Sequence, residues 1–266
     1  MSGEERREAE ERSLSPTETD TGTPQAPPLR LWLLNETVQP RLSVIVPTYN
    51  EGESLPGLIR RLSQLRDIPL EVVVVDDASP DGTGMLAESL AQQHALPVQV
   101  LHRSNKRGLA TAVIDGASVA RGEILTVMDA DLSHPPEALP ALLAGIDAGA
   151  EIAIASRYVA GGGIRGWPPL RRLISRSATM LARWMLGLNV RDPLSGFFAV
   201  RRELLTDSQY LGVGYKLLLE VLAAHRSRRI VEIPYEFVDR RLGQSKLSAR
   251  ELLSFLRLLV YLKARR

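Results

Sequence analysis

The hydrophobic positions of this 266-residue chain follow a regular pattern only after residue 41. From there, short apolar runs alternate with longer segments in which apolar residues recur at helical spacing. The short runs predict strands at 42–46, 71–76, 98–102, 124–128, 152–156, 197–201 and 230–238, and the longer segments predict helices at 54–65, 83–94 and 110–120. The four consecutive valines at 72–75 suit a strand buried on both faces. The alternation therefore predicts an α/β fold, with a mostly parallel central sheet of right-handed β-α-β units flanked by helices.

Two further segments, 170–188 and 248–263, predict amphipathic helices. The apolar face of the first would contain Leu170, Leu173, Ile174, Ser177, Leu181, Trp184, Met185 and Leu188, and its polar face Arg172, Arg176, Thr179 and Arg183. Such a helix could pack on the core with a solvated arginine face, or it could contact a membrane surface. The second helix is apolar nearly all round and too short to span a bilayer, so it suits a membrane surface or a buried packing partner.

Composition places the chain among globular proteins. Zero Cys excludes a disulfide scaffold, a thiolate metal site and a cysteine nucleophile. No window reaches the roughly 18 uncharged apolar residues of a membrane span, and the start of the chain lacks the apolar core of a signal peptide. We therefore expect a cytoplasmic protein.

The net charge of +2 hides an uneven distribution. Residues 1–40 carry four basic and eight acidic side chains and have no apolar periodicity, which predicts a disordered acidic tail. Residues 41–266 carry 29 basic and 23 acidic side chains, concentrated as nine Arg against one Asp in 157–202 and eight Lys/Arg against one Glu in 240–266. These basic segments indicate an anionic partner, either a phosphorylated substrate, lipid headgroups or nucleic acid. The low aromatic content and the absence of a recognised motif argue against nucleic acid.

Carboxylates follow three of the predicted strands. Glu51 follows the first, Asp76 and Asp77 follow the second, and Asp129 and Asp131 follow the fourth. In a parallel sheet these ends meet at one edge, where ligands bind. Two carboxylates two residues apart in a turn can face one Mg²⁺ or Mn²⁺ ion. An isolated Asp-x-Asp is more typical of an ordinary turn, but a second acidic cluster at the same edge would repel the first without a ligand, which favours a site.

Other polar side chains at this edge suit a nucleotide. Asp76 and Asp77 offer acceptors for a nucleobase N–H or a ribose hydroxyl, and Tyr49 could stack on a base. Arg240 and Lys246 flank a glycine turn and could fold over a diphosphate.

Two other features predict no site. The glycine run at 161–166 satisfies the G-x-G-x-x-G pattern, but it follows the fifth predicted strand and is separated from the next helix by Trp-Pro-Pro, so a flexible loop is the better interpretation. The four histidines lack metal-ligand spacing, and we interpret them as structural.

Seven segments form an ordered set over roughly 42–250. They are Pro-Thr-Tyr-Asn-Glu at 47–51, Val-Asp-Asp-Ala-Ser-Pro-Asp-Gly-Thr at 75–83, Asn-Lys-Arg-Gly-Leu at 105–109, Asp-Ala-Asp-Leu-Ser-His-Pro-Pro at 129–136, Ser-Arg-Tyr at 156–158, Ser-Gly-Phe-Phe at 195–198 and Arg-x-x-Gly-x-Ser-Lys at 240–246. Each is weak evidence alone, but together they are specific. The set resembles the family 2, GT-A fold glycosyltransferases, and within them the dolichyl-phosphate mannosyltransferase group. The resemblance implies a Rossmann-like GT-A fold.

The resemblance also implies roles for individual residues. Pro47, Tyr49, Glu51, Val75 and Asp77 would hold the guanosine of a donor, and Asp129, Ala130 and Asp131 would hold its sugar diphosphate and a metal ion. Ser133 stands where some relatives have a Gln that also contacts the metal. Arg157, Arg240 and Lys246 would contact the donor phosphates or sugar, and Arg157, Arg171 and Ser175 would contact the acceptor phosphate.

The implied activity is inverting, metal-dependent transfer of mannose from GDP-mannose to a polyprenyl or dolichyl phosphate, with Mg²⁺ or Mn²⁺. A lipid phosphate is already ionised at neutral pH, so its attack would need no dedicated general base. Two alternatives remain open. The same fold could use UDP-glucose or another sugar nucleotide, or the protein could be a non-catalytic nucleotide- or lipid-binding module.

The implied organisation has three parts: a disordered tail at 1–40, a GT-A catalytic domain at 41–247 and an amphipathic helix at 248–266 that lies on the membrane surface. Many members of the group have C-terminal membrane spans, which this sequence lacks. We therefore expect a peripheral protein on the cytoplasmic face of the membrane, attached directly or through an anchoring partner protein.

Overall fold

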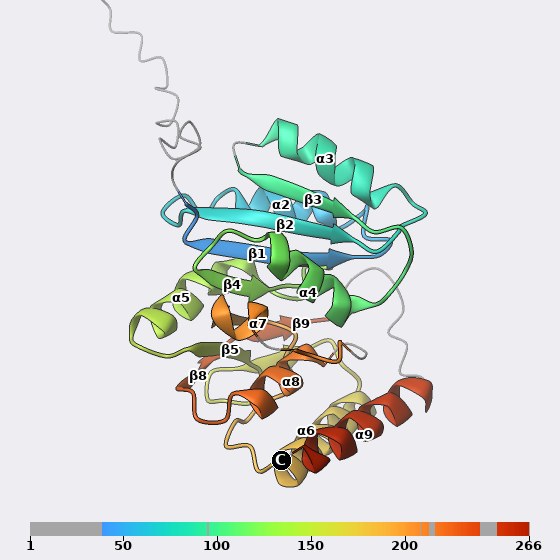
Figure 1. Ribbon diagram of the computed structural model, residues 1–266, viewed down its shortest axis with the longest axis vertical. Helices are drawn as coiled ribbons and strands as arrows, with labels where there is room; N and C mark the ends of the chain where they lie inside the picture. Colours follow the sequence, from blue (N-terminus) through green and yellow to red (C-terminus); the bar gives the residue numbers. More distant parts are fainter. Residues whose placement is uncertain (1–38, 95, 208, 213–215, 240–248, 266) are drawn as a thin grey trace, which may run out of the picture.

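The computed structural model describes residues 39–94, 96–207, 209–212, 216–239 and 249–265. Within these residues, seven strands form one sheet in the order β3-β2-β1-β4-β7-β5-β8, and β6 pairs with β9 in a separate ribbon (Figure 1). The strands are β1 (Leu42–Thr48), β2 (Leu70–Asp76), β3 (Val98–His102), β4 (Ile124–Val127), β5 (Ile152–Ser156), β6 (Gly163–Arg165), β7 (Phe198–Arg201), β8 (Ile230–Pro234) and β9 (Glu236–Val238). The helices are α2 (Leu55–Leu62), α3 (Thr83–Gln93), α4 (Leu109–Val119), η2 (Pro136–Ala138), α5 (Leu139–Asp147), α6 (Pro169–Leu186), α7 (Glu203–Thr206), α8 (Leu217–Ala224) and α9 (Ala249–Ala264).

The sheet is mostly parallel, as the sequence predicts. β1 pairs in parallel with β2 on one side and β4 on the other. β7 is the antiparallel exception, inserted between β4 and β5. The α/β class with a GT-A-like sheet is therefore confirmed.

The four valines of β2 lie in two different hydrophobic clusters. Val72 and Val74 join the cluster that contains α2, α3 and α5, whereas Val73 and Val75 join the cluster that contains α4, α7 and α8. All seven residues of β2 are buried. Helices therefore cover both faces of this strand, which explains why its sequence is continuously apolar rather than alternating.

Two segment predictions need correction. The single strand predicted over 230–238 is two strands, because the chain leaves the main sheet at the buried Tyr235 and β9 then pairs with β6. The glycine run predicted as a flexible loop contributes β6 to this pairing. Partner strands from distant parts of the chain decided both outcomes.

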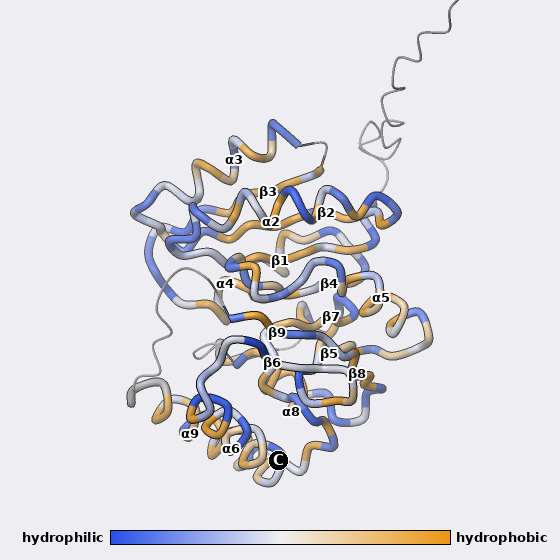
Figure 2. The backbone as a smooth tube through the Cα atoms, turned by 180° about the vertical axis from the view of Figure 1, so that it is seen from behind, coloured by the Kyte–Doolittle hydropathy of each residue, from blue (hydrophilic) through white to orange (hydrophobic). Residues whose placement is uncertain are grey.

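Helices α6 and α9 lie together at the end of the molecule opposite β3 and α3 (Figures 1 and 2). They share a cluster of buried apolar residues: Ala182, Leu186, Leu194, Leu219, Phe255, Leu258 and Leu259. The faces predicted for α6 are partly wrong, because Thr179 of the expected polar face is buried, whereas Leu170 and Trp184 of the expected apolar face are 68% and 77% exposed. The helix ends at Leu186 because Gly187 adopts a left-handed conformation with φ 58°.

Among the described residues, no helix combines the length and apolar character that crossing a membrane would require. The predicted tail falls almost wholly on residues 1–38, outside the described residues. The division into tail, catalytic domain and surface helix therefore stays a prediction.

Candidate functional site

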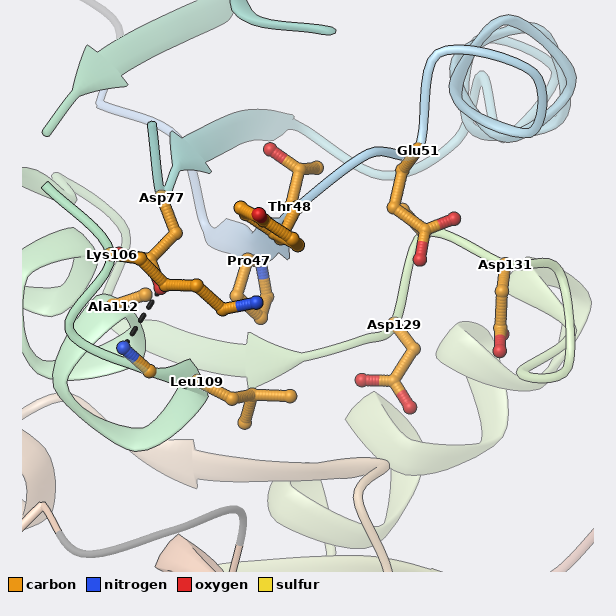
Figure 3. Close-up of a pocket in the computed structure, with 12 residues that line it drawn as sticks. Pro47, Thr48, Glu51, Asp77, Lys106, Leu109, Ala112, Asp129 and Asp131 are labelled. Carbon is orange, nitrogen blue, oxygen red and sulfur yellow. Dashed lines mark hydrogen bonds between the residues drawn. The ribbon is translucent and has the colours of Figure 1, made fainter. Parts of the chain in front are cut away.

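A pocket of about 260 Å³ opens at the carboxyl edge of the sheet (Figure 3). It is built by the segments that follow β1, β2, β3 and β4, with the start of α4. Its lining residues are Pro47, Thr48, Tyr49, Glu51, Asp77, Lys106, Gly108, Leu109, Ala112, Asp129, Ala130 and Asp131. The prediction that carboxylates from three strand ends meet at one edge is therefore confirmed.

The junctions around this pocket contain unusual backbone conformations. In the described part of the chain, the non-glycine residues with positive φ are Asn50, Ala78 and Leu132, at 57°, 60° and 62°. They follow β1, β2 and β4 respectively, each within two residues of a lining residue. A left-handed conformation is costly for a side chain such as leucine and persists only where the surroundings enforce it. These turns fix the directions in which the lining carboxylates point.

Asp77 anchors the loop that follows β3. Its carboxylate accepts hydrogen bonds from Arg103 Nη1 at 2.7 Å and from the backbone N–H groups of Arg107 and Gly108 at 2.9 and 2.8 Å. The Asp77 and Arg103 side chains are only 6% and 3% exposed. Asp115 lies 3.2 Å from Arg103 Nε and extends this ion pair. Asp77 therefore shapes the pocket wall as well as lining it.

Two residues predicted to bind the nucleoside of the donor, Asp76 and Val75, lie outside the pocket lining, and so does Arg157, which is predicted to contact the donor phosphates or sugar. Asp76 turns back into its own loop, where it accepts hydrogen bonds from the backbone N–H and hydroxyl of Ser79 and from Thr48 Oγ1. Val75 is fully buried in the core cluster that contains α4. Asp76 thus stabilises the turn beside the pocket, and Val75 belongs to the core.

The three residues of the first junction that the resemblance assigns to the guanosine all line the pocket: Pro47, Tyr49 and Glu51. Glu51 Oε2 accepts a hydrogen bond from the Ser54 hydroxyl at 2.8 Å, at the start of α2. Tyr49 is 37% exposed, and the Lys106 amino group lies over its ring.

Asp129 and Asp131 follow β4 and lie on the side of the pocket opposite Asp77 and Lys106 (Figure 3). The backbone N–H of Asp129 donates to His134 Nδ1 at 3.1 Å, and Asp131 Oδ1 accepts the backbone N–H of Ser133 at 3.0 Å. The Ser133 hydroxyl is buried and has no hydrogen-bond partner among the described residues. No group of three or more His, Cys, Asp or Glu side chains in the described chain is arranged to hold a metal ion. The described carboxylates of this turn are Asp129 and Asp131.

His134 supports this turn from inside the protein, which agrees with its interpretation as structural. Its ring stacks on Phe197 with centroids 5.2 Å apart and meets Tyr235 and Phe237 edge-on. Burial lowers the pKa of His134 to about 4. The neutral ring can therefore accept the Asp129 N–H through Nδ1 at physiological pH.

The three residues predicted to bind an acceptor phosphate surround Trp167 and Tyr158. The Arg171 guanidinium lies 4.2 Å from the Trp167 ring centroid and pairs with Asp239, while Arg157 lies 5.7 Å from the same ring. The Ser175 hydroxyl is 2.8 Å from the Tyr158 hydroxyl, and Tyr158 also borders Arg157. The structure thus brings Arg157, Arg171 and Ser175 into one cluster, separate from the lining of the pocket.

Arg157 is the most constrained member of this cluster. Its Nε and Nη2 each donate to Asp192 at 2.8 Å, and its side chain is 8% exposed against 0% for Asp192. Burial works against the charged form of Arg157, but the hydrogen bonds and charge of Asp192 outweigh it and raise the pKa of Arg157. The guanidinium is therefore permanently charged and fixed in orientation.

Arg240 and Lys246 lie outside the described residues. Conversely, the pocket is also lined by residues to which the sequence pattern assigned no role, namely Thr48, Lys106, Gly108, Leu109 and Ala112. The predicted topology could have indicated the residues at 106–109, because the strand at 98–102 is parallel to its neighbour and the loop that follows it therefore reaches the same edge of the sheet.

The mostly parallel sheet, with helices on both faces and an acidic pocket at the carboxyl ends of its strands, is typical of doubly wound α/β proteins, which bind ligands at that edge. The chain belongs to a particular family of that type, glycosyl transferase family 2, whose model matches residues 43–208.

Related proteins are similar in sequence to this chain over most of its length. A dolichol-phosphate mannosyltransferase from Pyrococcus furiosus is 43% identical over 82% of this chain, which spans 62% of that longer protein. A polyprenol monophosphomannose synthase from Mycolicibacterium smegmatis is 42% identical over 81% of this chain and 85% of its own length.

Solved structures support the fold. A glucosyl-3-phosphoglycerate synthase from Mycobacterium tuberculosis, crystallised with Mn²⁺, UDP-glucose and phosphoglyceric acid, superposes with a TM-score of 0.66. It is 23% identical, and the match covers 85% of this chain and 80% of that one. At this identity the likeness establishes the shared fold.

Proposed function

We propose that this protein transfers mannose from GDP-mannose to a polyprenyl phosphate of the dolichyl type, with inversion at the anomeric carbon. The observation that carries the proposal is the convergence of Tyr49, Asp77, Asp129 and Asp131 on one pocket in a family 2 chain. The names of the 42–43% identical relatives supply the sugar and the class of acceptor.

The Asp129–Asp131 side of the pocket fits a divalent cation bound together with a diphosphate. Mg²⁺ and Mn²⁺ are commonly held by one or two carboxylates, with phosphate and water oxygens completing their coordination. The buried Ser133 hydroxyl beside this turn has no hydrogen-bond partner among the described residues, so its oxygen could contact such a cation. When bound, such a cation would stabilise the charge that develops on the leaving diphosphate.

The residues of this chain supply binding and orientation rather than a general base. A phosphate monoester oxygen is anionic at neutral pH and can act as the nucleophile without losing a proton. His134, which lies next to the acidic turn, accepts the backbone N–H of Asp129. The chemistry therefore depends on holding an anionic acceptor in line with the donor.

The cluster around Trp167 is suited to the acceptor phosphate. Arg171 provides a partly exposed guanidinium, with 22% of its side chain accessible, and Ser175 provides a hydroxyl one turn along the same helix. Arg157 adds a fixed positive charge beside them. Asp192 and Asp239 already pair with these two cations, so a phosphate headgroup would bind through the Arg171 N–H groups that Asp239 does not occupy and through the Ser175 hydroxyl.

Helix α6 also links this cluster to an apolar surface. Leu170, Leu173 and Ile174, next to Arg171 and Ser175 in the sequence, are 68%, 62% and 41% exposed. We define the α6–α9 face as the exposed apolar residues of both helices: Leu170, Leu173, Ile174, Met180, Trp184, Leu252, Leu253, Leu256, Val260 and Tyr261. An exposed apolar surface of this kind, interspersed with arginines, suits the interface of an anionic membrane. We therefore propose peripheral attachment through this face, with the phosphate of a membrane-embedded acceptor reaching α6.

Transfer of radiolabelled mannose to short polyprenyl phosphates, with and without EDTA, tests the proposal. We expect transfer from GDP-mannose that EDTA abolishes and excess Mg²⁺ or Mn²⁺ restores. UDP-glucose and UDP-N-acetylglucosamine, carrying label in their sugars, serve as matched donors. Transfer from a UDP-sugar in place of GDP-mannose would overturn the donor assignment, and a protein inert with every donor and lipid phosphate would favour a non-catalytic binding module.

A further inference from the structure

Lys106 is the only positively charged residue among the described residues that line the pocket. It belongs to the loop after β3, and its side chain is exposed. Figure 3 shows its amino group directed toward the middle of the pocket. The other lining residues with charge are Glu51, Asp77, Asp129 and Asp131.

The contacts of Lys106 distinguish it from its cationic neighbours. Its Nζ lies 3.2 Å from the centroid of the Tyr49 ring. It forms no hydrogen bond or ion pair with a described residue, whereas Arg103 pairs with Asp77 and Arg107 pairs with Asp115. An exposed cation over an aromatic face is a weak interaction that a ligand can displace. The ammonium group is thus available for a stronger partner.

The fold places Lys106 at the end of the pocket remote from the acidic turn. The loop after β3 approaches from the β2 side of β1, whereas Asp129 and Asp131 follow β4 on the other side. Asp77 fixes the backbone N–H groups of Arg107 and Gly108, so the stem of Lys106 starts from a rigid anchor. A nucleoside diphosphate whose diphosphate lies at Asp129–Asp131 would therefore present its base to Tyr49 and Lys106.

We propose that Lys106 selects the base of the donor nucleotide. The base takes the place of the ammonium group on the face of Tyr49, because stacking of a nucleobase on an aromatic ring is stronger than an exposed cation–π contact. The displaced ammonium group then donates to O6 and N7 of guanine. This assignment rests on the proposed function, which supplies a guanine nucleotide as the donor.

The hydrogen-bonding edges of the bases give this contact its selectivity. Guanine presents two adjacent acceptors, O6 and N7, and lysine or arginine is their usual partner. Adenine presents an N6 amino donor in place of O6, which the ammonium group would repel. A pyrimidine lacks N7. Hypoxanthine keeps both O6 and N7, so inosine diphosphate isolates the contribution of this edge.

The experiment measures the dissociation constants of GDP, IDP, ADP and UDP by isothermal titration calorimetry in Mn²⁺. The wild type is compared with Lys106→Met, which keeps the apolar stem, and with Lys106→Arg, which keeps the donors. Arg107→Met is the matched control, since it removes an adjacent charge from the same loop without altering a residue that lines the pocket. All variants change exposed side chains, so their fold should persist.

We expect Lys106→Met to weaken the binding of GDP and IDP by about 10- to 100-fold, the worth of one hydrogen bond to a charged group, and to leave the binding of ADP and UDP within about twofold of the wild type. Lys106→Arg should retain the guanine preference, and Arg107→Met should match the wild type. Equally weakened binding of all four nucleotides would assign Lys106 to the diphosphate and overturn base selection. Unchanged binding of all four would also overturn base selection. A wild type that binds GDP no more tightly than ADP or UDP would instead refute the proposed donor.

Discussion

Replacement of Asp192 by asparagine would remove a negative charge that lies wholly inside the protein. Asp192 is 0% exposed and accepts three hydrogen bonds from Arg157, two from the guanidinium at 2.8 Å and one from the backbone N–H at 3.0 Å. The Arg157 side chain is 8% exposed, so water cannot replace the lost carboxylate. The substitution leaves a buried guanidinium facing a neutral amide that has only one oxygen to offer it.

The expected cost is about 3–5 kcal/mol in the free energy of unfolding, the usual effect of removing one partner of a buried ion pair. An unfolding entropy of about 2.1 cal/mol/K per residue over roughly 225 folded residues converts this cost into a fall in Tm of about 6–11 °C. Because Arg157 borders Trp167 and Tyr158, transfer to lipid phosphate should fall as well.

Thermal unfolding followed by circular dichroism measures this effect. Glu236→Gln is the control, because it breaks the same kind of pair with Arg165 where the two side chains are 50% and 68% exposed, and its Tm should not change measurably. The double variant Arg157→Met/Asp192→Asn, which removes both charges of this pair, should melt above Asp192→Asn alone. Equal Tm values for Asp192→Asn and the wild type would refute the assignment of this pair as a buried, energetically coupled unit.

Three further substitutions test the other parts of the proposal. Asp131→Ala should lower mannose transfer at least about 100-fold, since the cation loses one of two carboxylates; activity close to that of the wild type in the radiolabel assay would contradict the metal assignment. Arg171→Ala should raise the KM for polyprenyl phosphate by about 10- to 100-fold, the worth of a charged hydrogen bond, while calorimetry finds the GDP affinity unchanged; a parallel loss of GDP affinity would contradict a separate acceptor cluster. Trp184→Glu on the α6–α9 face should reduce co-sedimentation with anionic vesicles, whereas Met85→Glu, 71% exposed on α3, should not; equal behaviour of the two variants would argue against membrane contact through this face.

The two sides of the pocket differ in how far the sequence predicts them. The carboxylates of Asp129 and Asp131 follow a buried strand within a few residues, so local pattern and sheet topology suffice to place them. Lys106 approaches through a longer loop whose course depends on the hydrogen bonds that Asp77 makes with Arg107 and Gly108. Such contacts join residues about 30 positions apart, and no local period encodes them.

The Asp76–Asp77 pair illustrates the same limit within a single dipeptide. Both aspartates suit a ligand by composition, yet Asp76 is engaged by Ser79 and only Asp77 lines the pocket. Adjacent side chains at the end of a strand point in different directions. The turn after the strand, with Ala78 in a left-handed conformation, then determines what each one meets.

The sequence by itself determined the α/β class, most strand positions and the edge at which the site lies. These features follow from short-range periodicity and from the parallel order of strands, which hold wherever apolar faces must be buried. The tertiary structure alone decided that β7 runs antiparallel and that residues 230–238 divide between two sheets. It also decided that, on α6, Thr179 is buried and Leu170 is exposed. Each of these outcomes depends on which distant segment supplies the packing or hydrogen-bonding partner, because burial belongs to the assembled fold and not to a stretch of chain.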